Sequence, residues 1–442
     1  MTPTTRQHPR LALFPKDTTV NSAGHLMIGG CDAYDLAKEY GTPLYVYDEE
    51  TLRHQCREFV ERFSNRYPDT VVCYASKAFL NRAMARLLKD EGLGLDVVSG
   101  GEMAIARSVG FPPERVYFHG NNKTPDELGE ALDWDIGRIV VDNIDELRLL
   151  DKMAGESGVV QEILLRLTPN VDPHTHEYTT TGVLDSKFGM PISTGHAEEA
   201  LAEALRMRNV SLLGLHFHLG SPIPAPAPYE AALGVVIDFA REMKRKYDFD
   251  LMELNVGGGF PARYTVDDAY PPVAVYADGI ITTLSNLLLR NSLLPPRLTI
   301  EPGRAISAKA GVALYTVGWR KSIPGVRTFV CVDGGMSDNI RPPLYGARYE
   351  AMVANKASET DAQTVTIAGK LCESGDILIR DIQLPRVVAG DVVALPAAGA
   401  YCVPMASNYN AIPKPAVVFV NRGNSRIVRR RETYDDLVSL DL

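Results

Sequence analysis

Eight short apolar runs, most of them separated by stretches long enough to hold a helix, occupy the middle of this 442-residue chain. A strand–helix rhythm repeated eight times is typical of a (β/α)8 barrel, in which each parallel strand is followed by a helix. A doubly wound open sheet would give a similar rhythm with fewer strands. The count of eight therefore favours an α/β barrel. The runs are residues 71–75, 93–98, 116–118, 139–141, 163–167, 212–217, 251–256 and 298–300.

The sequence changes in character after about residue 310. Short β-prone runs at 364–367, 377–379 and 417–420 are bounded by Gly, Pro and Asn, and helical periodicity is scarce. This pattern predicts a mostly antiparallel β domain, and the apolar run at 43–47 is expected to add a strand to it. The expected division is an N-terminal tail at 1–24, a β domain from 25–48 and 311–442, and a barrel at 49–310.

Composition argues against several classes of function. The net charge is -9 and no long basic run occurs, so we expect no nucleic-acid partner. No apolar leader segment or run of transmembrane length is present, which predicts a cytoplasmic location without a membrane partner. The six cysteines are scattered and form no C-x-x-C pair, which indicates reduced thiols rather than disulfides or a zinc knuckle.

Lys77 lies just beyond the first apolar run. Ligands of parallel α/β folds bind at the C-terminal ends of the strands, so its ammonium group is expected to point toward a binding site. A partly desolvated lysine there can lose a proton and form a Schiff base. On its own, such a lysine would more often be an ordinary surface residue, and the ends of the later strands decide between the two interpretations.

Three consecutive glycines, Gly257, Gly258 and Gly259, follow the seventh run. Without Cβ atoms, their backbone N–H groups can crowd around an anion, although such a run is often only a tight turn. Ser221, at the neighbouring strand end, would add a hydroxyl donor. The pattern is not G-x-G-x-x-G, so it is compatible with a phosphate site but does not indicate a dinucleotide fold.

Two histidines, His216 and His218, are two residues apart in the sixth run and should face the same side of a strand. They could be a packed pair, or one imidazole could stack on a flat cofactor ring. They could also bind a metal together with His174 and His176. Acidic ligands at metal spacing are not evident, so we expect no metal.

Glu301 ends the eighth run beside a Pro-Gly turn. It could form a salt bridge with Arg304 or another arginine, or it could bind a pyridine nitrogen and keep that nitrogen protonated. A protonated ring is the stronger electron sink, which suits chemistry that forms a carbanion at Cα.

The region after the barrel supplies a cation, an acid, a thiol and phenols, which together suit a zwitterionic substrate. Each could instead be only a loop residue. The segments are 333–346, with Arg341 and Tyr345; 372–376, with Cys372 and Glu373; and 399–401, which ends in Tyr401.

These motifs, in this order, resemble those of the fold-type III pyridoxal-phosphate (PLP) decarboxylases, and within them the branch that acts on diaminopimelate. The resemblance runs from about residue 25 to the C-terminus. It implies an alanine-racemase-like barrel, a C-terminal β domain, PLP as the cofactor, and a homodimer with shared active sites.

The resemblance also implies roles for individual residues. Lys77 corresponds to the lysine that binds the cofactor's aldehyde, and His218 to the imidazole stacked on its ring. The phosphate would be held by Gly257, Gly258, Gly259 and Ser221, and the pyridine nitrogen by Glu301. The substrate would contact Arg304, Arg341, Tyr345, Glu373 and Tyr401, of which Arg304 and Tyr401 also lie near the cofactor. Cys372 matches the proton donor, and segment 372–376 would come from the partner subunit.

The expected reaction is the decarboxylation of meso-2,6-diaminopimelate to L-lysine and CO2, the last step of lysine biosynthesis. The fork of an arginine such as Arg341 suits a distal carboxylate, and Glu373 suits a distal ammonium group. Ornithine lacks that carboxylate and would leave a buried arginine unpaired.

Four alternatives remain open at this point. The first is a related PLP decarboxylase acting on another diamino acid, a carboxylated polyamine or a carrier-bound amino acid. The second is a racemase, which Glu301 disfavours because a weaker electron sink limits side reactions. A catalytically silent PLP-binding protein and a zinc hydrolase are the others.

Overall fold

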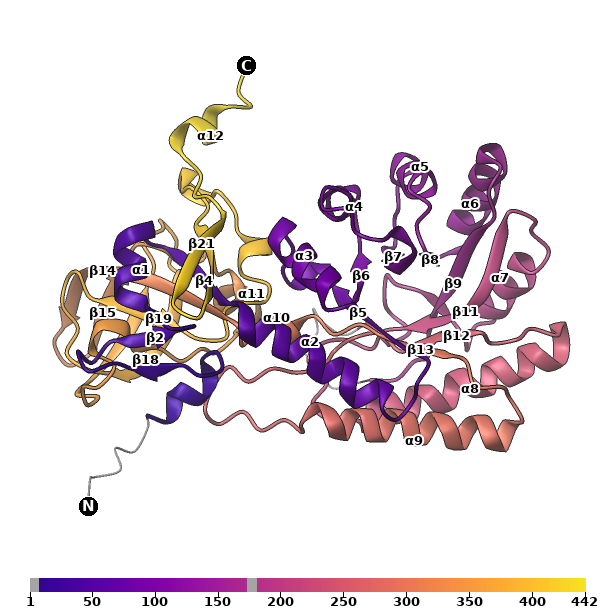
Figure 1. Cartoon of the computed structure of the whole chain (residues 1–442), viewed down its shortest axis with the longest axis horizontal. Helices are drawn as coiled ribbons and strands as arrows, with labels where there is room; N and C mark the ends of the chain where they lie inside the picture. Colours follow the sequence, from indigo (N-terminus) through magenta and orange to yellow (C-terminus); the bar gives the residue numbers. More distant parts are fainter. Residues whose placement is uncertain (1–7, 173–180) are drawn as a thin grey trace. The chain divides into compact units, whose positions relative to one another are not determined.

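The computed structural model describes residues 8–172 and 181–442 (Figure 1). The chain folds into two compact units. The barrel unit comprises Cys56–Pro261 and Tyr270–Gly303, and the β unit comprises Met1–Gln55, Ala262–Ala269 and Arg304–Leu442. None of the helices in the described ranges is both long enough and apolar enough to cross a bilayer.

The barrel unit contains a closed ring of eight parallel strands. In ring order they are β5 (Thr70–Ala75), β6 (Gly94–Val97), β7 (Val116–Phe118), β8 (Arg138–Val141), β9 (Gln161–Thr168), β11 (Val210–Phe217), β12 (Glu253–Asn255) and β13 (Arg297–Ile300). β13 pairs with β5 and closes the ring, while the short β10 (Met190–Pro191) pairs with β9. Each strand overlaps one of the apolar runs, so the predicted barrel is confirmed.

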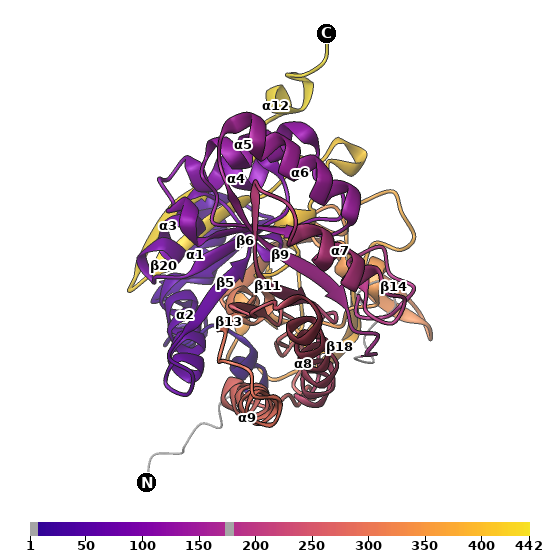
Figure 2. The ribbon, with the colours of Figure 1, turned by 90° about the vertical axis from the view of Figure 1, so that its right-hand side faces the viewer.

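Helices surround the strands, as the end-on view in Figure 2 shows. They are α3 (Arg82–Asp90), α4 (Gly100–Arg107), α5 (Pro125–Asp133), α6 (Ile144–Ser157), α7 (His196–Ala204), α8 (Ala227–Tyr247) and α9 (Val273–Asn291), and α2 (Glu49–Ser64) contains the boundary between the units. Four helices begin at a side chain that accepts a backbone N–H of the first turn: Asn81, Ser99, Thr124 and Asn143. Such caps fix where each helix starts after its strand.

A buried polar network lies inside the barrel. Glu253 accepts hydrogen bonds from Tyr117 (2.6 Å), Thr299 (2.9 Å) and Arg138 (3.1 Å). Its side chain is almost fully buried, so these donors replace the water that the carboxylate loses on folding. Glu253 therefore has a structural explanation and is not needed for chemistry.

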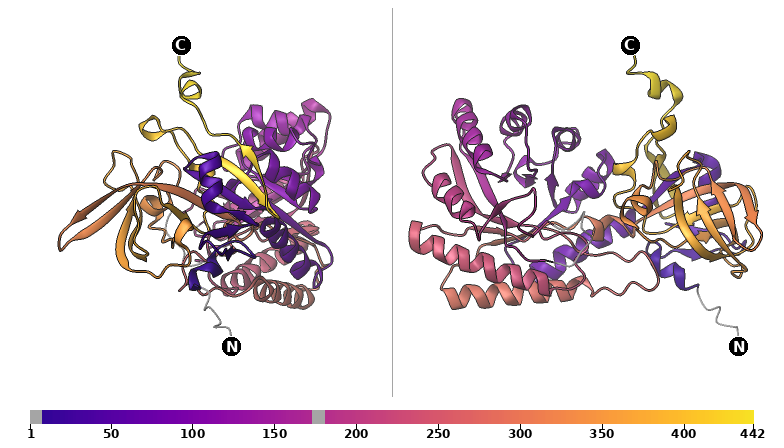
Figure 3. Two further views of the ribbon diagram at one scale, coloured as in Figure 1. Left: turned by 60° about the vertical axis from the view of Figure 1, so that its left-hand side comes forward. Right: turned by 180° about the vertical axis from the view of Figure 1, so that it is seen from behind.

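The β unit is built on a mixed sheet with the order β18-β17-β15-β14-β4-β20-β21. The run at 43–47 becomes β4, which pairs antiparallel with β14 and parallel with β20. Figure 3 shows the β14–β15 hairpin, in orange, reaching out from the rest of this unit. The domain limits expected from the sequence stay a prediction. The strands are β4 (Leu44–Asp48), β14 (Gly311–Ile323), β15 (Arg327–Val332), β17 (Gln363–Ala368), β18 (Ile377–Leu384), β20 (Ala416–Asn421) and β21 (Asn424–Arg429), with β16 (Met352–Val353) and β19 (Val392–Leu395) paired beside β14.

Candidate active site

Glu301 is the centre of a buried cluster in the barrel unit. It directly follows β13, and its side chain is only 5% exposed. Its Oε1 accepts a hydrogen bond from Asn255 (2.7 Å) and lies 2.9 Å from Nε2 of His119. Its Oε2 lies 3.3 Å from Nε2 of His216. The acid is thus fixed by residues at the ends of β7, β11 and β12.

The surroundings of Glu301 favour the ionised acid. Burial alone would raise the pKa of Glu301, but the contacts with His119 and His216 outweigh burial and hold that pKa well below its usual value. Burial lowers the pKa of His216 to about 4. Its Nδ1 has no hydrogen-bond partner among the described residues, as expected for a neutral ring that carries its proton on Nε2. The neutral imidazole therefore acts as a hydrogen-bond donor to a carboxylate.

Two further charged residues are buried beside this cluster. Asp96, near the end of β6, lies 3.9 Å from Nε2 of His119, and burial raises the pKa of Asp96. Arg166, on β9, lies over the ring of Phe188 (4.4 Å from the centroid) and 3.8 Å from Asp142. Arg166 is a further cation of the same rim, and its field acts on Glu301 and His218.

The cluster could in principle bind a cation. One ligand atom from each of His119, His216 and Glu301 lies within 4.8 Å of the others. His174 and His176, which the sequence also suggested as metal ligands, lie outside the described residues. Asn255 donates to Oε1 of Glu301, and this contact is compatible with a carboxylate that accepts from a protonated nitrogen as well as with one that binds a cation.

The three glycines bring the backbone close to its neighbours. A Cβ on Gly258 would lie 2.1 Å from the carbonyl oxygen of Glu301, and one on Gly259 would lie 2.5 Å from that of Gly220. The N–H of Gly257 is bonded to Asn255 (2.9 Å) and that of Gly258 to Nδ1 of His218 (3.1 Å). Among the described residues, the N–H of Gly259 has no acceptor. Two of the glycines therefore shape the turn, and the third offers its N–H to an anion.

His218 and Lys77 lie at the rim of the same barrel. Lys77 is in the 3-10 turn Ser76–Ala78 after β5 and is exposed. Burial, and then the charges of Lys77 and Arg166, lower the pKa of His218 well below its usual value. The hydrogen bond from Gly258 fixes the orientation of the neutral His218 ring. The ring is also close enough to Lys77 for the charge of that lysine to lower its pKa.

Ser221 belongs to the loop that follows His218. The next part of this loop is attached to the glycine run, because the N–H of Ile223 is bonded to the carbonyl oxygen of Gly259 (2.8 Å). The hydroxyl of Ser221 is therefore carried by a loop that is fixed to the glycine turn, as a shared anion site requires.

Two predicted substrate residues, Arg304 and Tyr401, lie together in the β unit. The guanidinium group of Arg304 lies 4.8 Å from the centroid of the Tyr401 ring and donates to the hydroxyl of Tyr264 (2.9 Å). Tyr401 has a positive φ of 61°, which is uncommon for a residue with a side chain. These contacts fix the plane of the guanidinium group.

Arg341 begins α11 (Arg341–Tyr345) and reaches the same aromatic group. It lies 4.4 Å from the centroid of the Tyr264 ring and donates to the hydroxyl of Tyr349, which lies 3.6 Å from Sγ of Cys402. The Tyr264 ring thus joins Arg304 to Arg341. Two buried guanidinium groups that tyrosines orient are suited to a substrate that brings carboxylates. Tyr345 lies at the other end of α11 and is partly exposed.

Cys372 and Glu373 are placed differently. Both are exposed, and within the described ranges no hydrogen bond or ion pair joins either side chain to Arg304, Arg341 or Tyr401. The N–H of Cys372 is bonded to the side chain of Asn410 (2.8 Å). The structure therefore brings Arg304, Arg341 and Tyr401 together and leaves Cys372 and Glu373 on their own loop.

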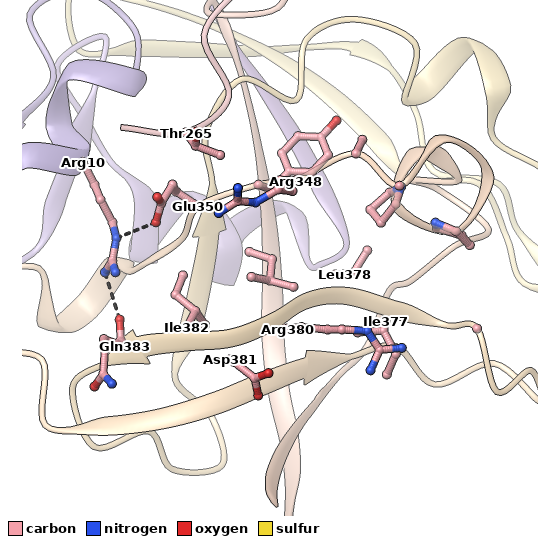
Figure 4. A pocket seen from close by; sticks show the side chains of 17 residues that line it. Arg10, Thr265, Arg348, Glu350, Ile377, Leu378, Arg380, Asp381, Ile382 and Gln383 are labelled. Carbon is pink, nitrogen blue, oxygen red and sulfur yellow. Dashed lines mark hydrogen bonds and ion pairs between the residues drawn. The ribbon is translucent and has the colours of Figure 1, made fainter. Parts of the chain in front are cut away.

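A cavity of about 640 Å³ lies elsewhere in the β unit, between α11 and β18 (Figure 4). At one end Arg10 donates to Glu350 (2.9 Å) and to the carbonyl oxygen of Gln383 (2.9 Å). Tyr349, which contacts Arg341, is part of its wall. Gly375 of segment 372–376 also lines it, but none of the residues given a site role from the sequence does.

Several site neighbours were not found from the sequence. They are Asn255 beside Glu301, and Tyr264, Tyr349 and Cys402 beside the two arginines. A signal did exist for Asn255, since it is a polar residue in the otherwise largely apolar run 251–256. The two tyrosines carry no comparable signal.

The barrel unit fits the cofactor expected from the sequence. PLP needs an anion site for its phosphate, an acid for its ring nitrogen and a lysine for its aldehyde. The open N–H of Gly259, the ionised Glu301 and the rim residue Lys77 offer these groups within one unit. The N–H of Gly259, which has no acceptor among the described residues, is the observation that most directly favours an anionic group at this turn.

Comparison with known proteins agrees with this geometry. Residues 51–308 match the family described as pyridoxal-dependent decarboxylase, pyridoxal binding domain. A diaminopimelate decarboxylase of Bacillus subtilis is 49% identical over 96% of each chain, and one of Mycobacterium tuberculosis is 42% identical over 97% of this chain and 98% of its own. The crystal structure of the diaminopimelate decarboxylase from M. jannaschii superposes with a TM-score of 0.90 at 37% identity, covering 96% of this chain and 97% of that one.

The barrel, its β unit and the family match define a PLP-dependent decarboxylase of fold type III. Within that class, the chain belongs to the diaminopimelate decarboxylase family. The resemblance inferred from the motifs is thus confirmed. The roles of the individual site residues stay predictions.

Proposed function

We infer that the protein decarboxylates meso-2,6-diaminopimelate to L-lysine and CO2 with PLP, as the last step of lysine biosynthesis. The observation that carries this conclusion is Glu301, which is buried at the barrel rim with His119, His216 and Asn255 against its carboxylate. When bound, PLP supplies an electron sink for the electron pair released as CO2 leaves. A racemase would benefit from a weaker sink, so Glu301 supports decarboxylation.

The barrel unit holds the cofactor in this proposal. Lys77 would hold the cofactor's aldehyde through its amine. His218, neutral and fixed by Gly258, would hold the ring, and Glu301 would keep the ring nitrogen protonated. Ser221 and Gly259 would donate to the phosphate, and Gly257 and Gly258 would shape the turn that holds it.

The β unit supplies substrate recognition. Arg341 and Arg304 are buried, cationic and oriented by tyrosines, so they suit the carboxylates of a diamino diacid. Burial alone would lower the pKa of Arg341, but the neighbouring phenols raise it above its usual value, which keeps the charge in place. Glu373 pairs with the distal ammonium group, and Tyr345 and Tyr401 complete the contacts.

We propose that Cys372 donates the proton that replaces CO2 at Cα. Cys372 and Glu373 are exposed and share no hydrogen bond with Arg341 within the described part of a single chain, which supports a homodimer in which segment 372–376 serves the partner's site. All six cysteines are free thiols, which supports a cytoplasmic location.

The test is to incubate the purified protein with PLP and meso-diaminopimelate and to measure CO2 and lysine. Ornithine, lysine and arginine serve as comparators. We expect turnover of diaminopimelate alone, because the other three lack the distal carboxylate. Turnover of a different diamino acid without lysine formation would instead favour a related decarboxylase.

A further inference from the structure

We propose that Asp376 is a positioning residue that holds the segment bearing Cys372 and Glu373 in its active geometry. The proposal rests on the functions inferred above for those two residues. Asp376 itself is buried and does not need to touch the substrate, so it would act through the backbone of its neighbours.

The carboxylate of Asp376 joins two loops. One oxygen accepts the N–H of Met336 (2.6 Å), and the other accepts the N–H of Leu371 (2.9 Å). Met336 lies five residues before Arg341, and Leu371 lies directly before Cys372. One side chain therefore fixes the segment that leads to a substrate arginine and the segment that carries the proton donor.

Two glycines make room for this carboxylate. A Cβ on Gly369 would lie 2.1 Å from one oxygen of Asp376, and a Cβ on Gly335 would lie 2.4 Å from the other. Any larger residue at either position would push the carboxylate out of its place. Both loops are thus shaped around Asp376.

The backbone closes the segment on itself. The N–H of Gly369 is bonded to the carbonyl oxygen of Asp376 (3.0 Å), and the N–H of Asp376 to that of Glu373 (3.1 Å). The side chains of Cys372 and Glu373 are exposed, so their positions depend on this backbone. Because Asp376 fixes the backbone N–H of Leu371, it also fixes the direction in which the side chains of Cys372 and Glu373 point.

The test is Asp376→Asn in the PLP-loaded enzyme. Asparagine keeps one acceptor oxygen, but its NH2 group faces one of the two N–H groups and cannot accept from it. We expect kcat to fall about tenfold to a hundredfold, because a misplacement of about 1 Å has that effect. KM for diaminopimelate should rise, because Glu373 would no longer be held in position for the distal ammonium group. The absorption of the Lys77-bound cofactor should not change.

A second readout separates positioning from stability. If a fixed thiol delivers the proton, turnover in D2O should give lysine with deuterium at Cα in a single configuration. The Asp376→Asn enzyme should give a mixture of the two configurations. The matched control is Asp391→Asn, another buried acid of the β unit that accepts a backbone N–H (Val388, 2.7 Å). It should lower the melting temperature and leave the deuterium stereochemistry unchanged.

Each outcome has a distinct meaning. If the wild-type protein does not convert diaminopimelate, the proposed function is wrong. If Cys372→Ala keeps the wild-type kcat, the thiol is not the proton donor. If both of these proposals hold and Asp376→Asn behaves like Asp391→Asn, the positioning role is wrong. Should Asp376→Asn fail to fold, Asp376→Glu decides, since it keeps the charge and displaces the oxygens by one methylene.

Discussion

Asn255 donates its side-chain amide to Glu301 at 2.7 Å, while its amide oxygen accepts the N–H of Gly257 at 2.9 Å. The side chain is fully buried, and the two contacts assign its nitrogen and oxygen without ambiguity. A single residue thus connects the acid proposed for the pyridine nitrogen with the turn proposed for the phosphate. The two ends of the cofactor site are therefore fixed relative to each other.

Replacing this amide with an acid should disturb both ends of the site. In Asn255→Asp a second carboxylate faces Glu301 at hydrogen-bond distance, and two such acids share a proton. We expect the pKa of Glu301 to rise, kcat to fall at least about tenfold, and PLP to bind less tightly. Steady-state kinetics and a PLP titration followed by absorbance measure these effects. Asn291→Asp, at the end of α9, is the matched control, and equal kinetics in the two variants would contradict the link.

The sequence predicted the parts of this molecule that carry a strong local signal. Eight apolar runs gave the strands, and Lys77, Glu301 and the glycine turn were found because they follow those runs directly. Tyr264 was missed since residues 262–269 interrupt the barrel sequence but fold with the β unit, which no periodicity reveals. Tyr349 was missed because a phenol that orients an arginine has no motif of its own.

Loss of the proposed lysine should abolish covalent attachment of PLP. In Lys77→Ala no amine remains at the end of β5, so borohydride should no longer fix PLP to the chain, and decarboxylation should fall about a thousandfold or more. Mass spectrometry of the reduced protein gives the measurement. Lys123→Ala is an unsuitable control, because Lys123 is buried and bonded to Glu146 (2.7 Å). The exposed Lys152 serves better. A reduced adduct retained in Lys77→Ala would mean that a different lysine binds PLP.

The neutral state of His216 predicts how stability depends on pH. The folded pKa of about 4 lies below the ordinary value of about 6.5, so the unfolded chain takes up this proton first as the pH falls. The contribution of His216 to the free energy of unfolding should decrease as the pH drops from about 6.5 to about 4 and stay constant below that. The total decrease should be on the order of 3 kcal/mol at most. Denaturant unfolding of the PLP-free protein and of His216→Gln measures it. Glutamine offers an N–H to Glu301 without titrating, so its curve should be flatter, and parallel curves would show that His216 is not the titrating group.

The exposed position of Cys372 in a single chain leads to a test of the shared site. If segment 372–376 serves the partner, then Lys77→Ala and Cys372→Ala subunits, each impaired alone, form mixed dimers with one intact site. Random exchange makes half of the dimers mixed, so mixing should restore about a quarter of wild-type activity. If Lys77 and Cys372 act within the same chain, every site keeps one defect and mixing restores nothing. Because both variants carry the same defects before and after mixing, only the arrangement of the subunits can change the rate.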